Sequence, residues 1–243
     1  MIERDILMQT KYGMMPAFAV CPDTGSPFPP VIFYMDAPGT REELRNMCRR
    51  IANRGYFCLL PDLYYRLGLL RFDIPRRNDA MSVVIRGAMN SLTNTFVAED
   101  TGGMISFLDA QDQVKPGPIG CVGHCMSGSF VATVAARYAS RIASAAALYG
   151  IGIVTDQPDS PHLLLDQVKG ELYFAFAEVD PAVPAKAITD LKVALEQKQI
   201  RHTLKVVPHT HHGYQFSARP DYEPNAAEAT WAELFALWER TLR

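Results

Sequence analysis

The chain has 243 residues, of which 48% are hydrophobic and 21% are charged, a composition typical of a folded protein with a sizeable core. Its net charge is −2 and no block of Lys and Arg occurs, so we expect no nucleic-acid partner. The charged start "MIERD" and the lack of an apolar run of about 20 residues predict neither a secretory signal nor a membrane span. We therefore expect a cytoplasmic protein that binds no membrane.

Apolar runs of strand length alternate with segments of helical period. The runs are "VIFYM" (31–35), "YFCLL" (56–60), "PIGCVG" (118–123), "SAAALYG" (144–150), "ELYFAFA" (171–177) and "TLKVV" (203–207). Runs that are apolar on both faces fit buried parallel strands. Helical stripes are formed by Leu44, Met47, Cys48, Ile51 and Ala52 and by Trp231, Leu234, Phe235, Trp238 and Leu242. The pattern predicts an α/β fold with a mostly parallel central sheet and helices on both faces.

The less regular segments are expected to lie near a site. Thr40 and Glu43 have the spacing of a capping box at a helix start. Residues 63–79 lack periodicity and predict a long loop over one end of the sheet, and residues 151–169 are similarly irregular. The first loop carries several arginines that fit either a solvated surface or an acidic substrate, namely Arg66, Arg71, Arg76 and Arg77. No repeat or linker interrupts the chain, so we expect one domain over residues 1–243.

The turn "GHCMSG" joins a predicted strand to the helical run 130–139. This is the context of a nucleophile elbow, in which the residues two before and two after the nucleophile must be small. Gly123 and Ser127 meet that requirement around Cys125. A helix N-terminus behind the turn favours a thiolate, so Cys125 is the candidate nucleophile.

Other interpretations of this turn remain open. Ser127 is a rival nucleophile, although its flanking residues Cys125 and Ser129 are not glycines. Free cysteines are also among the most buried residues, so Cys125 fits an inert thiol as well. A redox-responsive protein would need Cys121 to be exposed as a resolving partner, and we expect it to be buried. A non-catalytic binding protein on the same fold is the remaining alternative.

Two later loops supply partners for a nucleophile. Asp180 follows the strand run 171–177, and His212 follows the run 203–207 with Gly213 after it. The order nucleophile, acid, base is that of elbow hydrolases, and the carboxyl ends of parallel strands meet at one crevice.

Several competitors exist for these two roles. The acid role has Asp36 and Glu178 as rivals, and the base role has His209 and His211. The "HTHH" cluster has no further ligand at a regular spacing, and the five cysteines form no CxxC pair, so we expect no metal and no cofactor.

With these residues in place, the chain resembles the dienelactone hydrolase family of α/β-hydrolases. The likeness rests on "YMDAPG", "GYFCLLPDLYYR", "GHCMSG", "AEVDPAVP" and "HHGY". It implies an α/β-hydrolase fold and a Cys-Asp-His triad of Cys125, Asp180 and His212. The expected reaction is hydrolysis of a small carboxylic ester or lactone through an acyl-enzyme, by a monomer or homodimer.

Further roles follow from this resemblance and from the mechanism. The backbone N–H groups of Met126 and Ala37 are the expected oxyanion hole. Substrate-binding or thiol-modulating positions are expected at Asp36, Tyr64, Arg66 and Tyr214. The family has Glu where Asp36 stands, and it has an arginine a few residues past the catalytic histidine. The fourth residue past His212 is Phe216 and the nearest arginine is Arg219, so recognition of dienelactone itself is not carried over.

Overall fold

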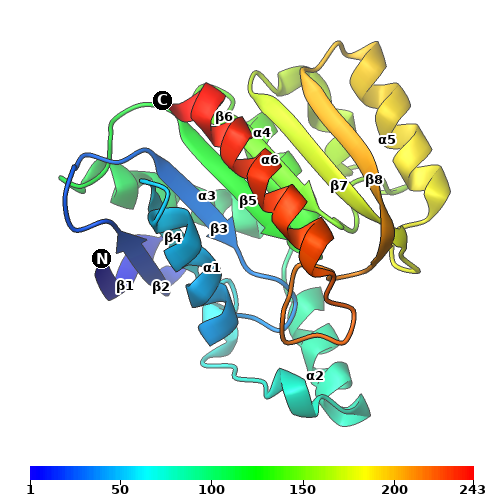
Figure 1. Cartoon of the computed structure of the whole chain (residues 1–243), viewed down its shortest axis with the longest axis horizontal. Coiled ribbons are helices and arrows are strands. Elements are labelled where there is room, and N and C mark those ends of the chain that lie inside the picture. The colour runs from blue at the N-terminus through cyan, green and yellow to red at the C-terminus, as the bar shows by residue number, and fades with distance from the viewer.

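A computed structural model describes residues 1–243 and shows an eight-stranded sheet in the order β1-β2-β4-β3-β5-β6-β7-β8 (Figure 1). The strands are β1 (Ile2–Thr10), β2 (Gly13–Cys21), β3 (Pro30–Tyr34), β4 (Phe57–Pro61), β5 (Ile119–His124), β6 (Ile142–Leu148), β7 (Glu171–Val179) and β8 (His202–His211). Strands β3 to β8 are parallel, whereas β1 and β2 form an antiparallel edge. The mostly parallel α/β fold is therefore confirmed.

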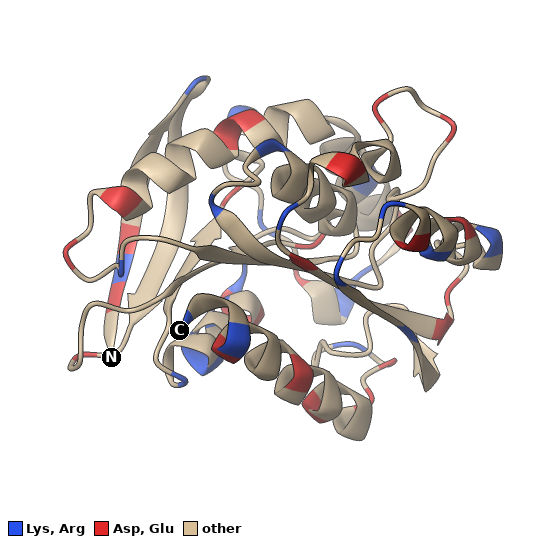
Figure 2. Ribbon diagram, turned by 90° about the horizontal axis from the view of Figure 1, so that it is seen from above, with Lys and Arg blue, Asp and Glu red and all other residues tan.

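Helices cover both faces of the sheet, which is seen edge-on in Figure 2. The α-helices are α1 (Glu42–Ala52), α2 (Asp79–Asn90), α3 (Asn94–Asp109), α4 (Ser127–Arg137), α5 (Ala185–Gln197) and α6 (Pro224–Leu242). Helices α1 and α6 lie on one face, and α3, α4 and α5 lie on the other (Figure 1). The two predicted helical stripes are confirmed, because every one of their residues is buried. No helix has both the length and the apolar character that a membrane crossing needs.

The β1–β2 hairpin is absent from the sequence prediction. Strand β1 exposes one side, where Glu3 and Asp5 alternate with more buried residues, so it carries no continuous apolar run. Strands that are solvated on one face alternate in polarity, and a search for apolar runs passes over them. The edge of a sheet is where such a strand belongs.

Two local predictions need correction. The capping box of Thr40 and Glu43 is wrong, because α1 begins after Arg41 and Glu43 binds the Arg41 guanidinium instead of the helix N-terminus. The predicted long loop 63–79 contains two short 3₁₀ turns, at Tyr65–Leu67 and Ile74–Arg76, before α2 begins. The segment 151–169 is irregular up to the 3₁₀ helix at Pro161–Gln167.

Candidate active site

Cys125 occupies a strained turn between β5 and α4. Its φ is 55°, in the left-handed region that residues other than glycine seldom adopt. A Cβ at Gly123 would lie 2.6 Å from the Ser127 carbonyl oxygen, and a Cβ at Gly128 would lie 2.3 Å from the Gly150 Cα. The strand and helix therefore close on each other only because these positions lack side chains, and the turn lifts Cys125 out of the sheet.

Ser127 has a different environment from Cys125. The Ser127 hydroxyl is fully buried and donates a hydrogen bond to the Met35 carbonyl, which ties the start of α4 to the end of β3. Cys125, in contrast, is only partly buried. Cys121 is fully buried, and burial raises the pKa of its thiol well above the ordinary range, so it does not reach the surface as a resolving thiol.

Asp180 and His212 meet at the ends of β7 and β8. The distance from His212 Nδ1 to Asp180 Oδ2 is 2.7 Å, and Asp180 also accepts the backbone N–H of Ala182 at 3.0 Å. The Asp180 side chain is 2% exposed and that of His212 is 21% exposed. Burial lowers the pKa of His212, but the hydrogen bond with Asp180 and the interaction with Cys125 outweigh it and raise the pKa to about 9.

Three residues that compete for these roles, Glu178, His209 and His211, are exposed. The Glu178 carboxylate accepts the backbone N–H of His209 at 2.7 Å, and the His209 side chain is 94% exposed. His211 is exposed as well. No group of three or more His, Cys, Asp or Glu side chains is arranged to hold a metal ion.

The two backbone groups expected to bind an oxyanion are unoccupied donors. Neither the N–H of Ala37 nor that of Met126 donates a hydrogen bond within the chain. Tyr64 holds both residues, because its hydroxyl donates to the Ala37 carbonyl at 2.7 Å and lies 3.5 Å from the Met126 sulfur. The buried Tyr64 thus fixes the loop after β3 against the elbow.

The Asp36 carboxylate is bound by two arginines. It is buried and pairs with Arg41 and with Arg219, the latter at 2.7 Å, and no hydrogen bond joins it to Cys125. Both guanidinium groups lie over the Phe216 ring, at 5.0 and 4.8 Å from its centroid. Asp36 therefore links the loop after β3 to the segment after His212. Arg41 and Arg219 are both paired with its carboxylate.

Two of the expected substrate-binding residues are bound by other parts of the chain. Arg66 pairs with the buried Asp100 of α3 at 2.9 Å and is enclosed by the rings of Tyr12, Tyr65 and Phe96. Its guanidinium therefore joins the β1–β2 turn to α3.

Tyr214 is the second of these residues. It is fully buried, and its hydroxyl shares a hydrogen bond of 2.8 Å with Thr230 of α6. Burial raises its pKa to about 12. Tyr214 anchors the turn after His212 to α6.

Three buried residues that sequence reasoning missed lie behind His212. The Tyr149 ring, at the end of β6 with a φ of 39°, packs edge-on at 5.1 Å from the His212 ring. The His124 ring packs against Tyr149 and binds Gln215, with 2.9 Å from His124 Nε2 to Gln215 Oε1. His124 precedes the elbow cysteine and could have been noticed for that reason, whereas nothing in the sequence marks Gln215 or Tyr149.

A cavity of about 350 Å³ borders the elbow at Met126. Ile151, whose N–H binds the Cys125 carbonyl at 3.0 Å, forms part of the wall. The cavity has no basic side chain in its lining, which consists of Met89, Leu92, Thr93, Asn94, Met126, Ser129, Phe130, Ile151, Gly152, Thr155, Gln157 and Asp159. A neutral, partly apolar group fits such a space.

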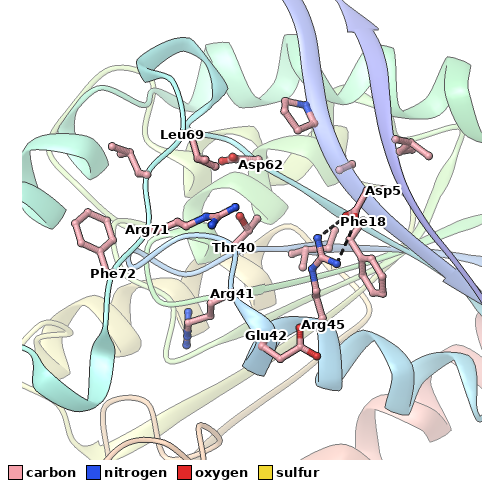
Figure 3. A pocket seen from close by; sticks show the side chains of 15 residues that line it. Asp5, Phe18, Thr40, Arg41, Glu42, Arg45, Asp62, Leu69, Arg71 and Phe72 are labelled. Atoms are coloured by element: carbon pink, nitrogen blue, oxygen red, sulfur yellow. Dashed lines mark hydrogen bonds and ion pairs between the residues drawn. The ribbon is translucent and has the colours of Figure 1, made fainter.

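A larger cavity of about 520 Å³ lies apart from Cys125, Asp180 and His212, between the β1–β2 hairpin and the start of α1. Arg71 projects into it beside Thr40, while Arg45 is paired with Asp5 (Figure 3). None of its lining residues belongs to the elbow or to the Asp180–His212 pair. The larger cavity is therefore not formed by residues of the expected site.

The fold and the elbow at the carboxyl end of β5 define a hydrolase of the α/β-hydrolase class. More narrowly, the chain belongs to the dienelactone hydrolase family, whose model matches residues 15–242. It is 24% identical over 238 residues to the "Putative carboxymethylenebutenolidase" of Methylorubrum extorquens, which covers 96% of this chain and 79% of that protein. It is 25% identical over 221 residues to the protein of the same name from Synechocystis sp., with 89% and 87% covered.

Solved structures show the same fold. The "Putative Dienelactone Hydrolase" of Klebsiella pneumoniae superposes with a TM-score of 0.88 at 21% identity and covers 98% of both chains. A metagenomic "Dienelactone Hydrolase-like" phosphotriesterase, P91, superposes with a TM-score of 0.82 at 14% identity, over 100% of this chain and 99% of that one. At these identities the structural likeness speaks for the fold alone.

Proposed function

We propose that the protein is a cysteine hydrolase of carboxylic esters or lactones that works through an acyl-enzyme. The observation that carries this proposal is the strained elbow at Cys125 beside His212, which is itself bound to Asp180 at 2.7 Å. The contact between Cys125 and His212 helps to raise the pKa of His212 to about 9, so His212 is an imidazolium at neutral pH. In the proposed reaction the attacking species is the thiolate of Cys125.

The reaction proceeds in two balanced halves. The Cys125 sulfur forms a bond to the substrate carbonyl carbon, and the oxyanion is held by the N–H groups of Met126 and Ala37. Collapse of the adduct breaks the bond to the leaving oxygen, which takes a proton from His212. Neutral His212 then takes a proton from water, whose oxygen attacks the thioester. The second collapse releases the acid and the Cys125 thiolate, and His212 again carries its proton.

Asp180 supports His212 in both halves. Its carboxylate holds Nδ1–H, which leaves Nε2 for proton transfer, and it stabilises the imidazolium. The free N–H groups of Ala37 and Met126 fit the oxyanion role, where one donor typically contributes about 3 kcal/mol to the transition state. The triad and the oxyanion hole thus use residues from four loops at one end of the sheet.

A sulfur nucleophile restricts the substrates. The thiolate is a better leaving group than an alkoxide, so the adduct reverts unless the departing oxygen is stabilised. Activated esters and enol lactones are therefore expected to react well and amides poorly. Relatives called carboxymethylenebutenolidase, and one from Bradyrhizobium called a "Probable 2-oxo-3-(5-oxofuran-2-ylidene)propanoate lactonase", support a lactone as the substrate class. The cavity beside Met126 would hold the neutral part of such a substrate.

The test is hydrolysis of an aryl ester by the wild type and by Cys125→Ala, with mass spectrometry for an acyl adduct. We expect the variant to lose the adduct and nearly all activity. Cys21→Ala, which changes a buried cysteine in β2, is the matched control and should retain both. Full activity in Cys125→Ala, or equal turnover of an aryl ester and the matching amide, would contradict the proposal.

A further inference from the structure

A buried hydrogen bond joins the nucleophile elbow to the segment that follows His212. His124 is the residue before Cys125, and Gln215 is the third residue after His212. The bond from His124 Nε2 to Gln215 Oε1 is 2.9 Å, and both side chains are buried. We propose that His124 and Gln215 are a positioning pair that sets the distance between the Cys125 sulfur and the His212 ring. This inference rests on the proposed function.

The donor and the acceptor of this hydrogen bond can be assigned, and neither side chain makes another hydrogen bond. A glutamine carbonyl oxygen only accepts, so His124 Nε2 carries the hydrogen. Burial lowers the pKa of His124 to about 4, so the ring is neutral at pH 7 and does not compete with His212 as a base. The other polar atoms, His124 Nδ1 and Gln215 Nε2, have no partner in the chain. This is therefore the only hydrogen bond that orients either side chain.

Packing transmits the position of His124 to the base. Its ring contacts Phe33 at 4.9 Å, Tyr149 at 5.8 Å and Phe216 at 5.2 Å between ring centroids. Tyr149 in turn lies edge-on to His212 at 5.1 Å. Buried rings at this density do not move independently, so a shift of Gln215 or His124 is passed to the His212 ring.

The other polar side-chain contacts of the segment after His212 are with the loop after β3 and with α6, not with β5. Arg219 binds Asp36 in the loop after β3, and Tyr214 binds Thr230 in α6. The pair of His124 and Gln215 is therefore the direct hydrogen bond between the segment after His212 and the strand that carries the nucleophile. A misplacement of reacting groups by about 1 Å costs on the order of 100-fold in rate. The loss of this hydrogen bond is therefore expected to slow the reaction.

The experiment separates positioning from stability with three variants: Gln215→Met, His124→Phe and the double variant. Each single change leaves one buried polar atom without its partner, whereas the double change removes both partners and keeps a ring in place of His124. For each we would measure kcat, KM and Tm with an aryl ester, and the rate at which iodoacetamide alkylates Cys125. The control is Ser144→Ala. The buried Ser144 lies near the start of β6, far from the elbow end of the sheet, and accepts a hydrogen bond from Thr241 of α6 that the change removes.

We expect Gln215→Met to lower kcat by about 10- to 100-fold with little change in KM, to slow alkylation at neutral pH and to lower Tm. The double variant should regain Tm but not kcat or the alkylation rate, and Ser144→Ala should lower Tm alone. Recovery of kcat together with Tm in the double variant, or unchanged kcat in Gln215→Met, would overturn the proposal. Full activity in Cys125→Ala would instead mean that the proposed function has failed, so the two failures are distinguishable.

Discussion

The raised pKa of His212 predicts how the stability of the protein depends on pH and on Asp180. Replacement of Asp180 by Asn keeps the shape and a hydrogen-bond acceptor but removes the negative charge that faces His212 Nδ1. Raising the pKa from 6.5 to about 9 corresponds to an upper limit of about 3 kcal/mol of stabilisation for the folded state. The interactions of His212 with Asp180 and with Cys125 both contribute to this stabilisation.

The sign follows from proton linkage. Because the pKa is higher in the folded state, this stabilisation is fully present below pH 6.5 and is lost as the pH rises through about 9. Asp180→Asn should therefore lower the free energy of unfolding by about 1–3 kcal/mol at pH 6 and by much less above pH 9. The His212 side chain is 21% exposed, so solvent screening places the effect toward the lower end of this range.

The assay is urea denaturation of the wild type and Asp180→Asn at both pH values. The same comparison in a Cys125→Ala background isolates the share of Asp180, because it removes the contribution of the sulfur. An equal loss at pH 6 and above pH 9 would refute the reasoning, since it would show that Asp180 stabilises the fold without reference to the charge on His212. The kcat of Asp180→Asn should also fall, on the order of 100-fold or more, because the His212 imidazolium loses its carboxylate partner.

Two further predictions concern the oxyanion loop and the cavity. Tyr64→Phe removes the donor to the Ala37 carbonyl, so we expect a loss of about 1–3 kcal/mol in urea denaturation and about a tenfold lower kcat at unchanged KM. An unchanged kcat would show that the loop holds its place without Tyr64. Leu92→Trp fills the cavity beside Met126, so KM for a long-chain aryl ester should rise about tenfold while KM for the acetate stays constant. Equal changes for both esters would place the acyl group elsewhere.

Much of the fold was predictable because it depends on periodicity. The apolar runs of β3 to β8 and the stripe of α1 are properties of neighbouring residues, and they correspond to the observed strands and buried helix face. Strand β1 was not, because it lies at the edge of the sheet and is solvated on one side. Strand β2 was not predicted either, although its residues 17–21 are apolar and buried. The capping box failed because Glu43 found a stronger partner in Arg41 than the backbone N–H of a helix start.

The candidate site was predictable in part for a similar reason. The elbow is a local pattern, since a Cβ at Gly123 would meet Ser127, only four residues further along the chain. The order of Cys125, Asp180 and His212 could be read from the strand ends that precede them. The ion pair of Arg66 was not predictable, because its partner Asp100 lies 34 residues away and nothing local indicates that contact.

The sequence by itself determined the fold class, the elbow and the three loops from which the proposed triad comes, because local spacing and hydrophobic period encode these. Only the tertiary structure decided that Asp36 is engaged by Arg41 and Arg219, and that His124 is bound to Gln215. These contacts join segments between 5 and 183 residues apart in the chain. Burial makes each of them matter, because a polar group removed from water must find a partner wherever the fold brings one.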